Sequence, residues 1–441
     1  MRPLRRRCAP RWRKPLISNL PKQRTDIMDN ASVSAMLHAL QDPAGLPAPA
    51  WIFQYLNVLT WSFHIAFVNL SLGSGLLAII AFMRRQQPAW ARLSVAMTGV
   101  AKIAVSMAIV LGVAPLLFTQ TIYDPSWYTS NVLSAFWVIF FIFTLGIGYT
   151  MWFVFYFKNH DVSHAAQAPD TTVWWATGAL SLLIFDGFIM HVLSYQGLFP
   201  QKWMQWYAPQ GVPVMNGMGI HAFELPRFAF FIVMSLTMTG VFLLGYARYF
   251  RARDDFPSDY LDLAHRIGVK TAYWGVALQL ITGLLWAWGL PAYMQVFTQP
   301  LFWLTLLLIV GVVLYARQVP VGGSALQAYS AMAFYALMAL VVSVDREALR
   351  VAYLAPFHYD LASKPHYEWG AVVWFFATFV GVGGSLVAFY TTMLWKAGKV
   401  KGLYTADRTV SRLGDVAVWI NWTWMASFFA IGVWAYVRNI L

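Results

Sequence analysis

The sequence is nearly free of cysteine, because Cys8 is the only one among its 441 residues. A disulfide within the chain needs two cysteines, and an iron–sulfur cluster needs several thiolates, so both are excluded. The Cys-x-x-Cys-His motif that attaches c-type haem is absent as well. Any cofactor must therefore be held by histidine, methionine, carboxylates or packing.

Charge is also scarce. Charged residues make up 11% of the chain and hydrophobic residues 59%, whereas a soluble globular domain has about 25% charged residues. The apolar residues form blocks of about 20 or more, which is the length that crosses roughly 30 Å of hydrocarbon. Backbone polar groups in lipid must be satisfied within their own segment, so these blocks predict helices. The predicted fold is an all-α integral membrane protein, a bundle of about ten transmembrane helices.

Ten such blocks define the domain organisation. They cover residues 54–83, 93–119, 129–157, 172–195, 222–250, 268–290, 299–317, 324–343, 369–396 and 415–438. Residues 51–441 thus form one polytopic membrane domain. Residues 1–50 form a basic N-terminal extension and a surface segment.

The distribution of Lys and Arg predicts the orientation in the membrane. Loops after the even-numbered spans carry only Lys202, Arg346, Arg350, Lys364 and Arg438, and the other loops carry most of the rest. Positively charged loops stay in the cytoplasm. The first helix is therefore expected to run from periplasm to cytoplasm of a bacterial inner membrane. The net charge of +13 reflects this bias and gives no indication of nucleic-acid binding.

The basic N-terminal stretch does not fit this orientation, because the topology places it outside. It lies between Arg5 and Arg24 and has no apolar signal-peptide core. We therefore expect the native protein to start at Met28. The alternative is a disordered basic arm.

Ionisable residues within membrane spans are costly and are candidates for function. His64 lies about ten residues from the outer end of its span, roughly 15 Å deep. It is a candidate haem ligand and the predicted metal-binding residue, or else a histidine bonded to a neighbouring helix. His191 lies near the outer end of the fourth span and has an interfacial or cofactor-binding role. Asp186 and Lys102 form a candidate proton or ion path, and the alternative for Asp186 is a structural hydrogen bond or ion pair.

Further polar residues gather near the outer boundary. His221 and Glu224 are three residues apart, so they share a face if the fifth span is helical from residue 222. Ordinary capping at the membrane surface is the alternative.

Arginines lie in the same region. Arg227 follows shortly after Glu224. Arg346 and Arg350, expected in an outer loop over residues 344–368, can pair with planar carboxylates such as haem propionates, or belong to a helix lying on the membrane surface. Together with the histidines they predict one polar site on the outer side.

One segment of the first span reads Phe63-His64-Ile65-Ala66-Phe67-Val68-Asn69-Leu70-Ser71-Leu72-Gly73. It resembles the first helix of the large subunit of cytochrome bd-type oxidases, in which the histidine binds a haem of the oxygen-reducing site. Other segments resemble the divergent bd-like branch and occur in the same order: Gly112–Phe118, Leu225–Phe228, Gln279–Trp286 and Asp345–Arg350. The resemblance implies haem b, with His64 as an axial ligand.

The sequence departs from that family at several points. The basic–Phe–x–His pattern of a low-spin haem ligand ends here in Phe230, which cannot bind iron. Only about eight residues join the sixth and seventh spans, so the long quinol-binding loop is missing. The third span has no acidic residue, and ten spans exceed the usual nine.

Three functional hypotheses follow. The first is a haem b subunit of a bd-like respiratory complex, in which Glu224 and Arg227 are the candidate catalytic residues near the haem. His221 is a further candidate cofactor-binding residue, and Arg227, Arg346 and Arg350 bind the haem propionates. Its partners would be other membrane subunits, with a periplasmic cytochrome c or a quinol as donor and oxygen as one candidate acceptor. The second is a haem-free scaffold paralogue, which Phe230 favours. The third is a transporter that couples ions through Lys102 and Asp186.

Overall fold

The structure is a computed structural model that describes residues 28–361 and 366–440. Over these residues the chain is helical and contains no β-strand, so the prediction of an all-α membrane bundle is confirmed. Nine helices are each long and apolar enough to cross a membrane. A tenth candidate span arises if α10 (Ser258–Gly289) is taken together with the short segment Ala292–Thr298, to which it is bent by 105°.

The other long helices correspond closely to the predicted spans. They are α2 (Ala50–Met83), α3 (Pro88–Ile122), α5 (Ala135–Lys158), α7 (Val173–Gln196), α9 (Leu225–Phe250), α11 (Pro300–Gln318), α12 (Ala325–Leu354), α13 (Trp369–Phe376), α14 (Gly384–Ala397) and α15 (Arg408–Ile440). A π-helical stretch, Ala377–Gly383, makes α13 and α14 one continuous span. Shorter helices α1 (Asn30–Leu40), α4 (Asp124–Leu133), α6 (Val162–Gln167) and α8 (Trp203–Tyr207) join or cover the long ones.

Helix α2 is the central helix of the bundle and packs against α3, α7, α9 and α12. Close approach depends on glycine where α2 meets α9. A Cβ atom on Gly73 would overlap the backbone carbonyl of Ser235. The same holds between α9 and α10, where a Cβ on Gly240 would overlap the backbone of Ala272. Small residues of this kind let membrane helices approach each other closely.

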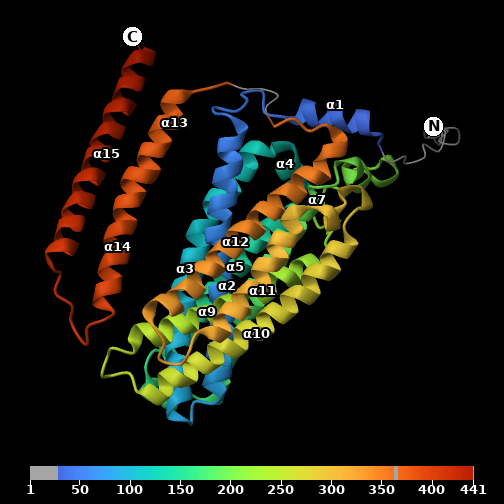
Figure 1. The fold of residues 1–441 in the computed structure, drawn as a ribbon. Coiled ribbons are helices and arrows are strands. Elements are labelled where there is room, and N and C mark those ends of the chain that lie inside the picture. The colour runs from blue at the N-terminus through green and yellow to red at the C-terminus, as the bar shows by residue number, and fades with distance from the viewer. Residues whose placement is uncertain (1–27, 362–365, 441) are drawn as a thin grey trace, which may run out of the picture.

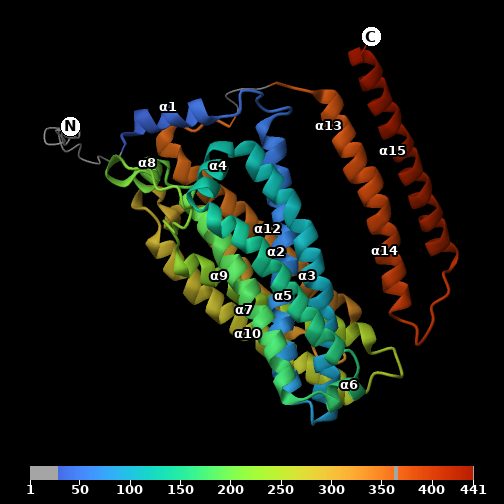
Figure 2. The same ribbon diagram turned by 180° about the vertical axis from the view of Figure 1, so that it is seen from behind.

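Helix α1 lies across one end of the bundle, beside α4 and α8 (Figures 1 and 2); we call this the α1 end. The side chain of Asp29 caps α1 by accepting from the Ser32 amide at 2.8 Å, and Val33 and Leu37 are buried against Trp203. Over the described residues, the segment before residue 50 thus packs on the end of the bundle through the buried side chains of α1. The basic stretch between Arg5 and Arg24 lies outside the described residues.

The helices α13, α14 and α15 stand apart from the main bundle (Figures 1 and 2). Few of their apolar side chains are buried within the chain. Contacts with the bundle lie near both ends of this pair of spans: Phe375 meets Phe118 edge-on, and the Tyr249 hydroxyl donates to the Trp395 carbonyl at 2.5 Å. The last helix ends at the α1 end (Figure 1), as an even number of crossings requires.

One boundary prediction was wrong. The eighth span was expected to end at residue 343 and to be followed by a loop, but α12 continues to Leu354. The hydropathy of the sequence falls at residues 345–350 because they are mostly charged. These charges stay inside the helix because most of them find partners within the bundle. Arg346 and Arg350 therefore lie in the last turns of α12.

Candidate functional site

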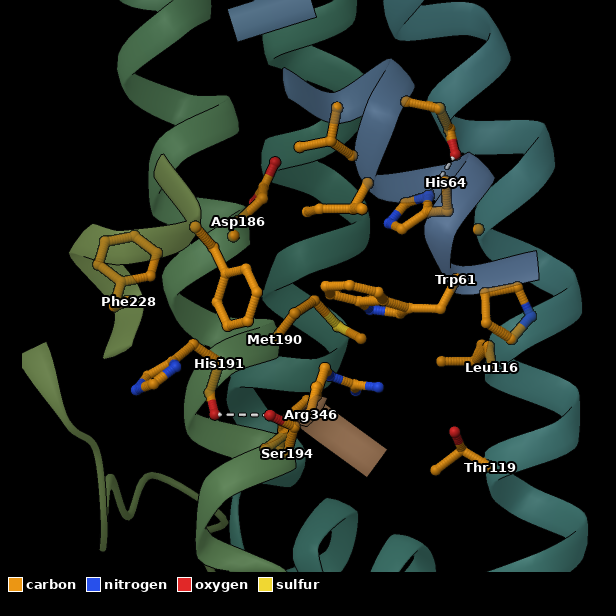
Figure 3. Close-up of a pocket in the computed structure, with 18 of the residues that line it drawn as sticks. Trp61, His64, Leu116, Thr119, Asp186, Met190, His191, Ser194, Phe228 and Arg346 are labelled. Carbon is orange, nitrogen blue, oxygen red and sulfur yellow. Dashed lines mark hydrogen bonds between the residues drawn. The ribbon is translucent and has the colours of Figure 1, made fainter. Parts of the chain in front are cut away.

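A cavity of about 320 Å³ lies inside the bundle between α2, α3, α7, α9 and α12 (Figure 3). Most of its lining is aliphatic or aromatic. Six residues predicted from the sequence contribute to this lining: His64, Asp186, His191, Arg227, Arg346 and Arg350. Lys102, His221 and Glu224 do not line it.

His64 lies on α2 with its ring against α3. Its Nδ1 atom is 2.9 Å from the backbone carbonyl oxygen of Ala108. A carbonyl oxygen only accepts, so Nδ1 carries the hydrogen and Nε2 keeps a lone pair. Gly112 makes this packing possible, because a Cβ atom there would lie 2.9 Å from the imidazole. The second ring nitrogen points into the cavity (Figure 3).

His191, on α7, has no free lone pair. The backbone N–H of Glu224 donates to its Nε2 atom at 3.0 Å, and the Arg227 guanidinium lies 3.4 Å from its Nδ1 atom. A neutral imidazole has one accepting nitrogen, and that nitrogen holds the start of α9 in place. Among the histidines in the cavity lining, His64 alone has a nitrogen available to a ligand.

Three arginines converge on the α1 end of the cavity. Arg227, Arg346 and Arg350 also line a smaller space of about 10 Å³ that shares these residues with the cavity. Arg346 lies over the Trp61 ring, 4.6 Å from its centroid, and within the described chain it forms no hydrogen bond or ion pair. Cations taken out of water are costly unless they are paired, so this region favours an anionic ligand.

Among the described residues, a single carboxylate forms an ion pair with this group of arginines. Glu347 lies 3.3 Å from Arg350, and both side chains are buried. The Tyr123 hydroxyl donates to Glu347 at 2.5 Å, and the Asn57 amide donates to it at 3.3 Å. Tyr123 also lies beneath the Arg350 guanidinium, 4.7 Å from it. The region therefore keeps an excess of positive charge.

Asp186 lies on α7 across the cavity from His64 (Figure 3). One carboxylate oxygen accepts from the Thr144 hydroxyl at 2.5 Å, and the other is buried with no hydrogen-bond partner in the described chain. Lys102 does not pair with it, because the Lys102 ammonium lies over the Tyr156 ring, 3.7 Å from its centroid. Lys102 and Asp186, the candidate proton or ion path, therefore contact different partners.

His221 and Glu224 do not share a helical face. The chain is irregular up to Glu224, and α9 begins at Leu225 with Pro226 in its first turn, as expected. His221 stacks on Trp206, while Glu224 accepts from the Tyr195 hydroxyl at 3.0 Å. Burial raises the pKa of Glu224 and lowers that of His221. The helical prediction failed because this chain segment crosses the α1 end before it turns into the bundle.

Phe230 lies in a different place from the main cavity. It is 3% exposed and packs on Trp286, with ring centroids 5.7 Å apart. Beside it is a second cavity of only about 50 Å³. The position at which the resemblance implies a second haem ligand is thus filled by aromatic side chains.

Three residues of the site were not identified from the sequence. Trp61, Tyr123 and Glu347 hold the arginines in place, yet none carries a motif of its own. Glu347 offered one signal, since it precedes Arg350 by three residues and an i,i+3 pair of opposite charge shares a helix face. This pair could be recognised only if the eighth span was predicted to remain helical through residue 350, and it was predicted to end at residue 343.

No protein-family model matches the chain, and no curated protein is significantly similar to it in sequence.

Proposed function

We propose that the chain is a haem b-binding membrane subunit of a cytochrome bd-like redox complex, with one haem in the cavity and His64 as its axial ligand. The observation that carries this proposal is the His64 ring. Its Nδ1 atom is held by the Ala108 carbonyl and its Nε2 atom faces a largely apolar cavity. Histidines that bind metals usually donate their other N–H to a carbonyl or carboxylate in this way.

The residues present fit such a group. Cofactor pockets are about 300–1,000 Å³, mostly apolar, with a few polar groups, and the cavity lies at the lower end of that range. A haem has a flat apolar ring and two carboxylates at one edge. The apolar lining suits the ring, and the unpaired positive charge of Arg227 and Arg346 suits the propionates. Guanidinium groups bind carboxylates in a planar, two-pronged geometry.

Each side chain then has a separate task. A bound haem would supply one-electron transfer and, with an open coordination position, reduction of oxygen. His64 would fix its position, while the arginines would hold its charged edge at the α1 end. Asp186, which lines the cavity from α7 and has one buried oxygen without a hydrogen-bond partner among the described residues, would exchange protons there. The Thr144 hydroxyl orients that carboxyl group.

The proposal extends to location and partners. The loops rich in Lys and Arg lie at the end opposite α1, which supports a bacterial inner membrane with the α1 end in the periplasm. Electrons would come from a periplasmic cytochrome c, a quinol or a second bd-like subunit. The exposed apolar faces of α13, α14 and α15 support assembly with other membrane subunits.

Phe230 favours a second candidate, a haem-free scaffold paralogue of such a complex. Phe230 occupies the implied second ligand position and packs on Trp286. The transporter hypothesis has less support, because Lys102 and Asp186 bind different partners. The scaffold predicts that His64→Ala leaves the spectrum of the chain unchanged.

Reduced-minus-oxidised absorption spectra of the chain purified from haem-replete cells test the proposal. Native protein should show a b-type band that His64→Ala loses. His38→Ala is the matched control, because His38 is exposed on α1, and it should keep the band. A flat spectrum of the native protein would reject the proposal and favour the scaffold.

A further inference from the structure

A group of metal-ligating side chains lies far from the cavity, at the end of the bundle opposite α1. It is formed by His160, Asp161 and His164, where the chain leaves α5 and enters α6 (Figure 2). One ligand atom from each of the three lies within 4.8 Å of the others. The group is accessible to solvent, so an ion can reach it without passing through the bundle.

The ring of His160 is oriented as a ligand. Its Nδ1 atom lies 2.9 Å from the Phe157 carbonyl oxygen, so Nδ1 carries the hydrogen and Nε2 is free. Nε2 lies 3.3 Å from Oδ2 of Asp161. Two ligands about 2.0–2.2 Å from one metal ion at a tetrahedral angle are separated by about that distance. The hydrogen bond to a backbone carbonyl is the usual outer support of a metal-bound histidine.

Asp161 uses its two oxygens differently. Oδ1 caps α6 by accepting from the His164 amide at 2.9 Å and from the Ser163 hydroxyl at 2.6 Å. Oδ2 lies 2.5 Å from Nδ1 of His164. One oxygen of Asp161 is thus directed toward both imidazoles.

Buried side chains fix the segment that carries these ligands. Asn159 is fully buried and donates to the Ser94 and Thr98 hydroxyls, each at 2.8 Å. On the other side, Arg85 donates to the backbone carbonyls of Ala165 and Ala168 at 3.0 and 2.8 Å. The ligands therefore stand on a short loop that is tied to α3 at one end and to Arg85, just after α2, at the other, and little conformational entropy is lost on binding an ion.

We propose that His160, Asp161 and His164 bind a divalent transition-metal ion, Zn²⁺ being the best match. Two imidazoles and a carboxylate are a common three-ligand set for zinc, with water in the fourth position. Calcium and magnesium prefer sites built from oxygen alone. The ion would join the end of α5 to the start of α6 and replace the proton shared by Asp161 and His164.

The experiment uses the full chain, purified without a polyhistidine tag, stripped with a chelator and titrated with ZnCl₂ in competition with a chromophoric chelator. The native chain should bind one Zn²⁺ that His160→Ala and His164→Ala each weaken by at least about tenfold, since loss of even an outer support costs about that much. The thermal unfolding midpoint should rise with Zn²⁺ more in the native chain than in His160→Ala or His164→Ala.

Two controls separate ligation from helix capping and from the other histidines. Asp161→Asn keeps an N-cap side chain but removes the anionic ligand, so it should fold normally and still lose the site. His38→Ala should bind as the native chain does. Equal zinc affinity in the native chain and in His160→Ala, or full binding by Asp161→Asn, would overturn the proposal.

Discussion

The imidazole of His64 on α2 is bonded through Nδ1 to the carbonyl oxygen of Ala108 on α3, at 2.9 Å. This carbonyl belongs to the helix interior, one turn before Gly112. The bond orients the ring and selects the tautomer whose Nε2 lone pair faces the cavity. The proposal that His64 holds one haem b rests on this relationship.

Gly112 should be required for the orientation of His64. In Gly112→Ala the new methyl group would lie 2.9 Å from the imidazole, so the ring must shift and the bond to Ala108 must lengthen. We expect lower haem occupancy or a displaced b-type band in absorption spectra. Gly99→Ala on the same helix is the control, because a Cβ there meets no atom within 4 Å. Identical spectra for both variants would contradict the role of Gly112.

The unpaired guanidinium of Arg346 should hold a propionate. Arg346→Gln removes the charge and leaves Trp61 in place, so haem should leave the protein faster. Charge-assisted hydrogen bonds contribute about 1.5–3 kcal/mol, which corresponds to roughly tenfold or more in the rate of loss. Transfer to an excess of a haem-scavenging globin measures this rate. Arg412→Gln, at an exposed position on α15, should lose haem as slowly as the native chain.

Glu224 should make stability depend on pH. Burial raises its pKa above the ordinary value of 4.5, so the folded chain binds more protons than the unfolded chain just above that value. Stability from this group is therefore fully present at lower pH and is lost as pH rises through the raised pKa. The thermal midpoint of native protein minus that of Glu224→Gln should fall over this range. A difference that rises with pH would contradict the assignment.

Asp186 should couple the haem to a proton. If its carboxyl group takes up a proton when the haem is reduced, the midpoint potential falls with rising pH, by at most about 59 mV per unit for one proton and one electron. Asp186→Asn should flatten this dependence in a redox titration. Asp345→Asn is a matched control, since Asp345 also accepts from a threonine, Thr305 at 3.4 Å, but beside the second cavity. Equal slopes in native protein and Asp186→Asn would exclude the coupling.

The long apolar helices could be predicted from sequence because hydrophobic length alone identifies them. The end of α12 could not, since Asp345, Arg346, Glu347 and Arg350 lower the hydropathy where a membrane helix is expected to stop. Their burial depends on partners from other helices, such as Tyr123 and Asn57 for Glu347. Such partners are distant in the sequence.

The candidate site, like the fold, could be predicted from the sequence only in part. His64, Asp186 and His191 could be selected because polar residues are rare inside spans, and all three line one cavity. The role of each of these residues could not be predicted, because it depends on which neighbouring residue forms a hydrogen bond with each of its polar atoms. The accepting nitrogen of His191 is occupied by the backbone N–H of Glu224, whereas His64 keeps one nitrogen free. The helical position predicted for His221 was wrong because the segment before α9 has no periodic pattern of apolar residues from which its conformation could be predicted.

The most direct test of the central claim is a pyridine haemochrome assay on the purified chain, with protein measured in the same sample. One haem b per chain in the native protein, close to none in His64→Ala and an unchanged amount in Phe230→Leu is the expected result. Phe230→Leu should keep its haem because Phe230 packs outside the cavity. A native chain without haem, or a His64→Ala chain that keeps a full equivalent, would contradict the account.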